Sequence, residues 1–267
     1  MKEQRDKPAE FVEALAKGIA ILEAFDAAHP EMTLSAVARR VGLSPAAARR
    51  SLMTLETLGY VGRRDKMFHL RPKLMALGSA FYFSARIDEI LEEDLRGIVE
   101  EFGDASSVGS LDGEDVIYVA HASVQRARRA TAVTGARYPA YATSMGRVLL
   151  AGLPDEDLDA YLQQVTPKKL TSKTCTAPEE LRAAIMEARR EGYATTVDQL
   201  DYGITALAVP IRDADGTTIA ALNTSGYTGI TTPDQLVKER LPVLQRTASH
   251  ISHQLTRYPT LRSVLGG

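Results

Sequence analysis

The stretch from Thr33 to Arg71 constrains the fold of this chain more than any other part of its sequence. Two helical patterns in this stretch flank the tripeptide at positions 42–44, Gly-Leu-Ser. Glycine readily adopts the left-handed conformation that ends a helix, and a serine followed by proline is a typical helix start. The second helical pattern has one apolar stripe, formed by Ala48, Leu52 and Leu55. Together these signals predict a helix-turn-helix.

The outer face of the second helix is suited to contact DNA. Small residues near its start allow close approach to base edges, and the two arginines that follow can reach bases or phosphates. Residues 60–70 then read as two short strands around a charged turn, which is typical of a wing that lies on the phosphate backbone. We expect DNA contacts from Arg39, Arg40, Ser44, Ala46, Ala47, Arg49, Arg50, Thr54, Arg63, Arg64 and Lys66.

The charge distribution supports the same interpretation. Residues 33–73 contain nine Lys and Arg against Glu56 and Asp65, a net charge of +7. The whole chain carries −2, so the remainder carries −9. A basic island in an acidic protein is the electrostatic pattern of a nucleic-acid-binding domain. The alternative is that the helix-turn-helix serves only as a packing motif and that its arginines coat a solvated helix.

Length and composition place the chain among ordinary globular proteins. Its 267 residues suggest two domains. No apolar run approaches the roughly 18 residues that span a membrane, and the N-terminal sequence MKEQRDKPAE lacks the apolar core of a signal peptide. The single cysteine, Cys175, excludes an internal disulfide and fits a reducing compartment, so we expect a cytoplasmic protein without membrane contact.

The rest of the chain predicts an α+β architecture. A helix over residues 9–27 can pack under the helix-turn-helix, and residues 72–86 form a further helix that is apolar on two sides, which indicates a linker helix with a dimer contact. From Ile87 onward the patterns predict an acidic helix to Gly103, strands, more helices, further strands and a long helix from about Thr232 to Arg257. This order suggests an antiparallel sheet covered on one face, in a domain that binds a small molecule.

Several segments together resemble the IclR family of bacterial transcription regulators. They are KGIAILEAF, TLSAVARRVGLSPAAARRSLMTLETLGYV, RYPAYATSMGRVLLA, GYATT, YGITALAVPI and AALNTSG, and they occur in order between about Phe11 and Arg257. The segment RYPAYATSMGRVLLA looks most like the branch that controls protocatechuate, 4-hydroxybenzoate and β-ketoadipate catabolism.

The resemblance implies three parts: a winged helix-turn-helix domain over residues 9–71, a linker helix over 72–86, and a GAF-like effector-binding domain over 87–258. It implies binding to double-stranded operator DNA, and dimers that can pair into tetramers. It also implies a small organic acid as effector, aromatic or dicarboxylic. Transferred onto this sequence, the family's effector pocket would comprise Tyr138, Ser144, Met145, Thr196, Ile204, Ala206, Asn223 and Ser225.

The sequence supports a catalytic function less well than a ligand-responsive DNA-binding regulator. Ser144 stands in Thr-Ser-Met-Gly-Arg rather than in a Gly-x-Ser-x-Gly elbow, and Cys175 has no paired histidine in its motif. His250 and His253 are spaced to share a metal ion, but no third ligand is evident. We therefore expect no catalytic residue, no metal and no cofactor. The competing hypothesis is a GAF-like sensor or small-molecule enzyme whose basic domain binds a protein partner.

Overall fold

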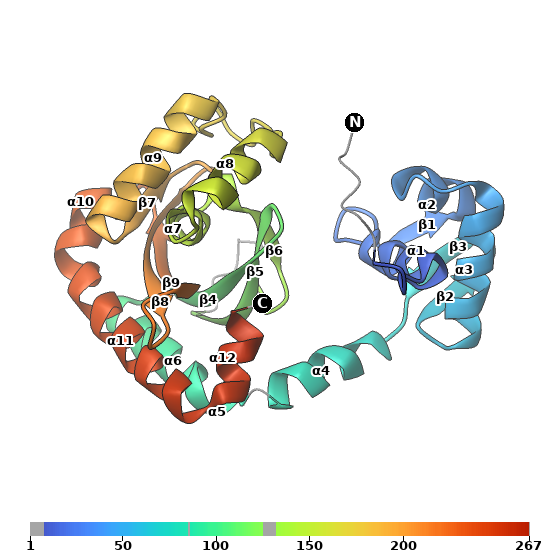
Figure 1. Ribbon diagram of the computed structural model, residues 1–267, viewed down its shortest axis with the longest axis horizontal. Coiled ribbons are helices and arrows are strands. Elements are labelled where there is room, and N and C mark those ends of the chain that lie inside the picture. Colours follow the sequence, from blue (N-terminus) through green and yellow to red (C-terminus); the bar gives the residue numbers. More distant parts are fainter. Residues whose placement is uncertain (1–7, 85, 125–131, 267) are drawn as a thin grey trace. The chain divides into compact units, whose positions relative to one another are not determined.

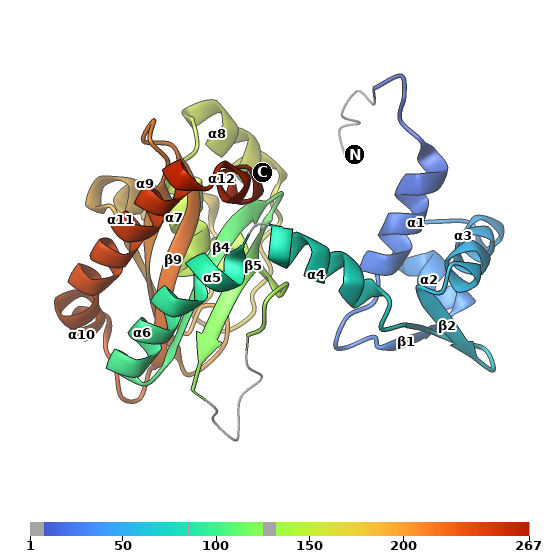
Figure 2. The same cartoon turned by 90° about the horizontal axis from the view of Figure 1, so that it is seen from below.

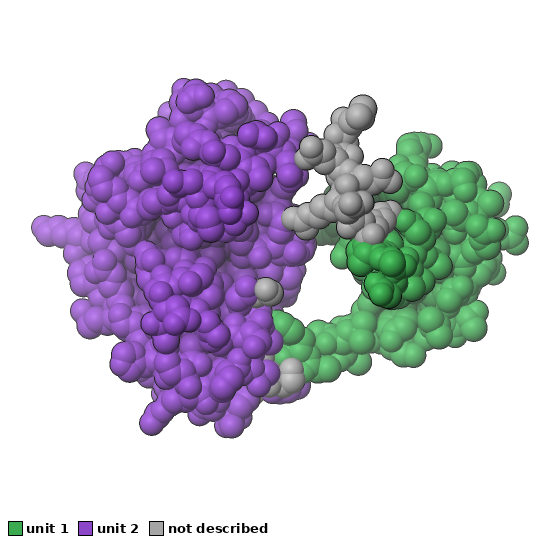
Figure 3. All heavy atoms as spheres, viewed as in Figure 1, with its two compact units in different colours: residues 1–81 green, residues 82–267 purple. Residues whose placement is uncertain are grey.

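The computed structural model describes residues 8–84, 86–124 and 132–266. The chain divides into two compact units, residues 1–81 and 82–267, which Figure 3 colours separately. The first unit is mainly helical and the second is built on a sheet, so the predicted α+β fold class is confirmed. None of the helices in the described ranges is long and apolar enough to cross a membrane.

The first unit contains a three-helix core and a small sheet. Its elements are α1 (Glu13–Glu23), β1 (Glu31–Thr33), α2 (Leu34–Arg40), α3 (Pro45–Thr57), β2 (Val61–Arg64) and β3 (Met67–Leu70). The strand order is β1-β3-β2, with both pairs antiparallel (Figures 1 and 2). Strand β1 was not predicted, because three residues beside a proline carry no clear alternation. Helix α1 is shorter than the predicted helix over residues 9–27.

The predicted turn between α2 and α3 follows from local backbone chemistry. Gly42 has φ +66°, the left-handed conformation that lets the chain leave α2. The Ser44 hydroxyl accepts a hydrogen bond from the amide of Ala47 at 3.3 Å and so caps α3. Inside the unit, Ala48, Leu52 and Leu55 pack with Ile21 of α1 in one hydrophobic core.

Helix α4 (Leu74–Ser84) follows the wing and leaves most of its apolar side chains exposed. Met75 is 74% exposed, Leu77 56% and Phe83 65%. The two apolar sides predicted from the sequence are therefore on the surface of the single chain, apart from Tyr82, which packs against the core of the second unit.

The second unit is organised around a six-stranded antiparallel sheet of order β6-β5-β4-β9-β8-β7. The strands are β4 (Ala105–Asp112), β5 (Asp115–Ser123), β6 (Arg137–Pro139), β7 (Ala194–Val197), β8 (Ile204–Arg212) and β9 (Thr218–Tyr227). The sequence patterns predict five of the six, over residues 105–111, 116–120, 193–197, 205–212 and 217–225, and each predicted bound lies within three residues of the observed one. Strand β6 was interpreted as a loop because of its glycine and proline neighbours; it pairs with β5, with Val116 opposite Tyr138.

Helices cover both faces of this sheet, so the prediction of one covered face was wrong. One layer comprises α5 (Ile87–Ile90), α6 (Glu92–Phe102), α10 (Pro233–Gln235), the π-helical segment η2 (Leu236–Arg240), α11 (Leu241–Arg257) and α12 (Pro259–Leu265). The other comprises the short helix η1 (Ala140–Ala142), α7 (Ser144–Ala151), α8 (Asp155–Gln164) and α9 (Pro178–Glu191).

The two layers bury separate hydrophobic cores on opposite faces of the strands. Leu207 and Val209 of β8 pack toward α6 and α11, whereas the intervening Ala208 packs toward α7 and α9. This is the alternation expected of a strand buried on both sides. Figure 1 shows the sheet curling around α7, and Figure 2 shows α5, α6 and α11 on the opposite face.

Candidate nucleic-acid interface and ligand cavity

The first unit presents the side chains that were predicted to contact DNA on the exposed parts of α2, α3 and the wing. Arg49 and Arg50 are exposed on α3, on the side away from the buried stripe. Ala46 lies beside them near the helix start, and Thr54 follows one turn later with its hydroxyl bonded to the carbonyl of Arg50. In the wing, Asp65 has φ +55° at the turn between β2 and β3.

Ion pairs divide the cations of this surface into two groups. Arg40 pairs with Asp26, Arg63 with Glu56 at 3.5 Å, and Arg64 with Glu31 at 3.4 Å. By contrast, four of the predicted cations have no ion-pair partner within the described ranges: Arg39, Arg49, Arg50 and Lys66. The four unpaired side chains are therefore available to phosphates or bases without first breaking an ion pair to another described residue.

The second unit contains a cavity of about 440 Å³ between the sheet and the start of α7. This volume lies within the usual range of small-molecule sites, roughly 300–1,000 Å³. Seven of the eight predicted effector residues line it: Tyr138, Ser144, Thr196, Ile204, Ala206, Asn223 and Ser225. The cavity therefore brings together residues from β6, α7, β7, β8 and β9.

Met145 is the exception among the eight. Its side chain is fully buried in the hydrophobic core on the α7 face of the sheet, near Gly109 of β4, and does not line the cavity. The two neighbours, Ser144 and Met145, project about 100° apart around the helix, so only one of them can face the cavity. The position of Met145 is thus corrected from the cavity wall to the core.

The sequence interpretation missed other residues of the lining, and two of them are aromatic groups from β5. Tyr118 meets Tyr138 edge to face with the ring centroids 4.9 Å apart, and burial raises the pKa of Tyr118. His121 holds Ser107 of β4 through its Nδ1 atom at 2.9 Å. The hydrophobic pattern of β4 and β5 predicted strands, but it did not indicate which of their polar residues face a cavity.

Three residues that line the cavity each carry a buried polar atom without a hydrogen-bond partner in the described chain: Ser144 Oγ, Asn223 Oδ1 and His121 Nε2. Each such atom costs about 1–3 kcal/mol of stability when it stays unpaired. Burial also lowers the pKa of His121, so its imidazole is neutral at pH 7 and one of its ring nitrogens is an acceptor. Three unsatisfied groups around one cavity are the arrangement expected of a site for a polar ligand.

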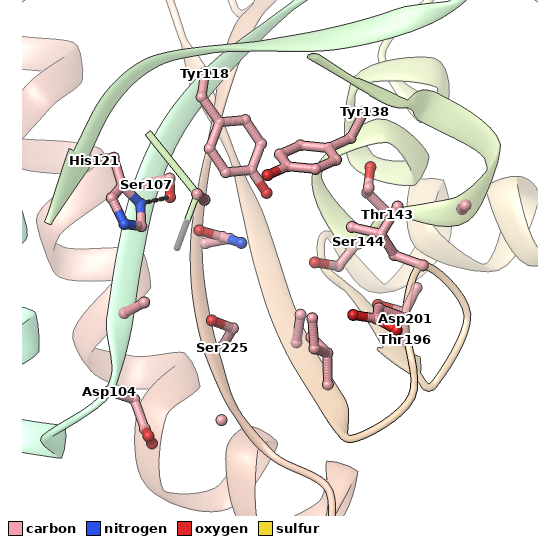
Figure 4. A pocket seen from close by; sticks show the side chains of 18 of the residues that line it. Asp104, Ser107, Tyr118, His121, Tyr138, Thr143, Ser144, Thr196, Asp201 and Ser225 are labelled. Atoms are coloured by element: carbon pink, nitrogen blue, oxygen red, sulfur yellow. Dashed lines mark hydrogen bonds between the residues drawn. The ribbon is translucent and has the colours of Figure 1, made fainter. Parts of the chain in front are cut away.

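The polar groups lie on different sides of the cavity. Figure 4 shows Ser144, Thr196 and Asp201 on one side, His121 and Ser107 on the other, and the hydroxyl ends of Tyr118 and Tyr138 pointing into the space between. The α7 side has a further property: the backbone amides of Ser144 and Met145 have no acceptor among the described residues. Free amides at a helix start favour an anionic group.

The start of α7 is held by a close approach between two backbones. The Thr143 hydroxyl caps the helix by accepting from the amide of Gly146 at 2.9 Å. A Cβ atom on Gly146 would lie only 2.0 Å from the carbonyl oxygen of Ala140 in η1. Only glycine permits this contact, which places η1 and α7 together at the cavity.

We expect Gly146→Ala to destabilise the protein by roughly 1–3 kcal/mol, because a buried backbone must move to accept the methyl group. Thermal unfolding followed by circular dichroism measures the change. The control is Gly97→Ala in α6, where nothing lies within 4 Å of the added carbon and the substitution should be neutral or stabilising. Equal melting temperatures for the two variants would contradict this account of the α7 start.

Neither His250 nor His253, both on α11, takes part in a cluster of metal ligands formed by described residues. His250 Nδ1 lies 3.0 Å from Asp94 on α6 and bridges the two helices. Across the described ranges, no three His, Cys, Asp or Glu side chains gather in a way that could hold a metal ion. Cys175 lies near Glu180, and burial raises the pKa of its thiol, which is the opposite of what an activated nucleophile requires.

Each of the two units matches a known protein family. Residues 14–65 match the model of the IclR helix-turn-helix domain, and residues 82–253 match the model described as bacterial transcriptional regulator IclR C-terminal. The chain is 36% identical over 247 residues to the Pca regulon regulatory protein of Pseudomonas putida, covering 92% of this chain and 85% of that protein.

Two further matches are similar in extent. The p-hydroxybenzoate hydroxylase transcriptional activator of Acinetobacter baylyi is 31% identical, with 91% of each chain covered. A crystal structure of a transcriptional regulator from Rhodococcus sp. RHA1 has 41% sequence identity and a TM-score of 0.76, covering 92% of this chain and 99% of that one. All three are named as regulators of transcription rather than as enzymes.

Proposed function

The chain belongs to the IclR family of bacterial transcriptional regulators, and on that premise we propose that it controls the catabolism of a hydroxylated aromatic acid by binding that acid in the cavity at α7. The DNA-binding unit is a winged helix-turn-helix, and the second unit is the ligand-binding one. The observation that carries the proposal is the set of buried polar atoms, on residues that line the cavity, without partners in the described chain. The name of the Acinetobacter relative supplies the chemical class.

The acid's carboxylate would lie at the α7 side of the cavity. The free amides of Ser144 and Met145 and the Ser144 hydroxyl are the donors there, and the helix dipole favours negative charge at this end. The aromatic ring would lie against Tyr138 and Ile204. A ring hydroxyl would reach the opposite wall, where neutral His121 and the side chain of Asn223 have unused hydrogen-bonding capacity.

Asn223→Ala or Ser225→Ala should weaken binding of the acid by about 1–3 kcal/mol, because each removes a polar group from the cavity wall. Calorimetry with protocatechuate, 4-hydroxybenzoate and β-ketoadipate measures this. Ser110→Ala is the control: its hydroxyl is also buried and unpaired in the described chain, but it lies outside the cavity. Normal binding by both cavity variants would mean that the ligand sits elsewhere, and no binding of any of the three acids would remove the aromatic-acid assignment.

We further propose that the regulator acts as a dimer that uses the apolar surface of α4. A single chain leaves Met75, Leu77 and Phe83 of this helix largely exposed, which is costly unless another surface covers them. A second copy of the chain would also place a second α3 on the DNA, since dimers of helix-turn-helix proteins bind paired half-sites. The ligand would change DNA affinity if it binds two arrangements of this dimer with different strengths.

A further inference from the structure

A buried cation lies on α7, three residues after Ser144 of the cavity lining. This cation is Arg147, which occupies the second turn of α7 and is only 7% exposed. Its Nη1 donates to the carbonyl of Thr195 at 3.4 Å, its Nη2 donates to Oε1 of Gln199, and its Nε is buried without an acceptor in the described chain. Both partners are neutral, so hydrogen bonds hold the guanidinium group but do not neutralise its charge.

No carboxylate in the described ranges forms an ion pair with Arg147. Burial is the dominant influence and lowers the pKa of Arg147, while Cys175 and then Glu187 act in the opposite direction. An arginine remains protonated in spite of such a shift. The described chain has one other buried arginine, Arg240, which is 6% exposed. Unlike Arg147, it forms an ion pair with a carboxylate, that of Asp104, at 2.7 Å.

Residues adjoining the partners of Arg147 form one wall of the cavity. Thr195 precedes Thr196, and Gln199 precedes Leu200; the second residue of each pair lines the cavity. The described lining contains no Lys or Arg, but it does contain the carboxylates of Asp104 and Asp201. A carboxylate bound here would meet no cation by direct contact among the described lining residues, and Arg147 would supply positive charge from behind the α7 side of the site.

We propose that Arg147 supplies the positive charge that makes the cavity selective for an anionic ligand, and that it does so through the protein interior without touching the ligand. The inference rests on the proposed function, since it takes the cavity as the effector site. Charges interact more strongly across a protein interior than across water, because less solvent screens them. A bound anion would compensate the buried charge of Arg147, and a neutral ligand of the same shape would not.

A purely structural role for Arg147 makes a different prediction. Oε1 of Gln199 also accepts from the amide of Cys175 at 3.3 Å, so the arginine helps to tie the loop before α9 to the segment after β7. Loss of this tie would distort the cavity and weaken acidic and neutral ligands alike. The charge proposal requires instead that the acid alone is affected.

The test compares 4-hydroxybenzoate with its neutral amide, 4-hydroxybenzamide, by calorimetry on the full-length protein. In Arg147→Gln the ratio of the two dissociation constants should shift against the acid by about tenfold or more, because the charge is gone while hydrogen-bonding capacity remains. Arg147→Lys retains the charge and should keep the wild-type ratio within about threefold. If Arg147→Gln proves unfolded by circular dichroism, Arg147→Met takes its place.

Arg189→Gln is the matched control in the same unit. Arg189 also donates to backbone carbonyls, of Ala151 at 2.8 Å and Leu153 at 2.7 Å, but it pairs with Asp155 and lies outside the cavity lining. Its ratio should equal that of the wild type. Equal weakening of both ligands in Arg147→Gln, or an unchanged ratio, would overturn the inference and leave the proposed function standing. Failure of the wild type to bind 4-hydroxybenzoate, protocatechuate or β-ketoadipate would overturn both.

Discussion

Replacing Arg49 and Arg50 by alanine is expected to weaken operator binding more than any other change of charge in this protein. Both side chains are exposed on α3 and neither forms an ion pair in the described chain, so nothing has to be broken before they contact DNA. If each makes a bidentate base contact, each single variant should lose roughly 1–3 kcal/mol, a weakening of about 5- to 150-fold. Electrophoretic shifts at fixed salt, with a duplex selected from a random pool by the wild type, measure the loss.

Arg246→Ala provides the charge-matched control. Arg246 is exposed on α11 in the other unit, so its removal changes the net charge equally without touching the proposed interface. Two measurements distinguish a phosphate contact from a base contact. Loss of a phosphate contact reduces the slope of log affinity against log salt concentration by about one, whereas loss of a base contact relaxes the preference for the operator sequence. Unchanged affinity in both α3 variants would contradict the assignment of α3 as the recognition helix.

If the protein forms the dimer proposed above, Leu77→Asp is expected to convert it into a folded monomer. Leu77 is 56% exposed in the single chain, so aspartate costs little there, but in a dimer contact it would place a charge in an apolar environment. Phe81→Asp, one turn later on α4, should act in the same way. Sedimentation velocity at micromolar concentration measures the change, and loss of the second half-site contact should greatly weaken DNA binding by the same variants.

Leu58→Asp is the control that distinguishes a specific disruption of the α4 contact from a general effect of placing a charge on an exposed leucine. Leu58 is 51% exposed just after α3, close to the exposure of Leu77, but it lies outside α4. The Leu58 variant should remain dimeric. A wild-type protein that sediments as a monomer, or a Leu77 variant that remains a dimer, would refute the role of α4.

Local chemistry determined the elements that the sequence predicted well. The turn between α2 and α3 depends on Gly42 and on the capping hydroxyl of Ser44, which act within a few residues. The hairpin of β8 and β9 follows in the same way from a turn at Asp213, whose carboxylate accepts from the amides of Asp215 and Thr217. Such features need no distant contact, so the pattern in the sequence is sufficient.

The cavity was predictable in part. Seven of its residues were named from the family resemblance, which transfers positions without deriving them. The residues alone did not separate Ser144 from Met145, because the direction of each side chain depends on how α7 packs in the curl of the sheet. They also gave no reason to choose His121 and Ser107, which lie 14 residues apart in the chain and meet only because β4 and β5 pair in one register.

Tertiary structure alone decided which charges are exposed and which are buried. Composition counts Arg49, Arg64 and Arg147 as equal, but the fold treats them differently. Within the described chain, Arg49 is exposed without an ion pair, Arg64 pairs with Glu31, and Arg147 is buried without a carboxylate partner. The sequence by itself determined the helix-turn-helix and the order of most helices and strands, since helix caps, turn residues and apolar periods are local, and the resemblance of whole segments indicated the family. The environment of each charge is set by residues far apart in the chain, and for that reason only the folded structure reveals it.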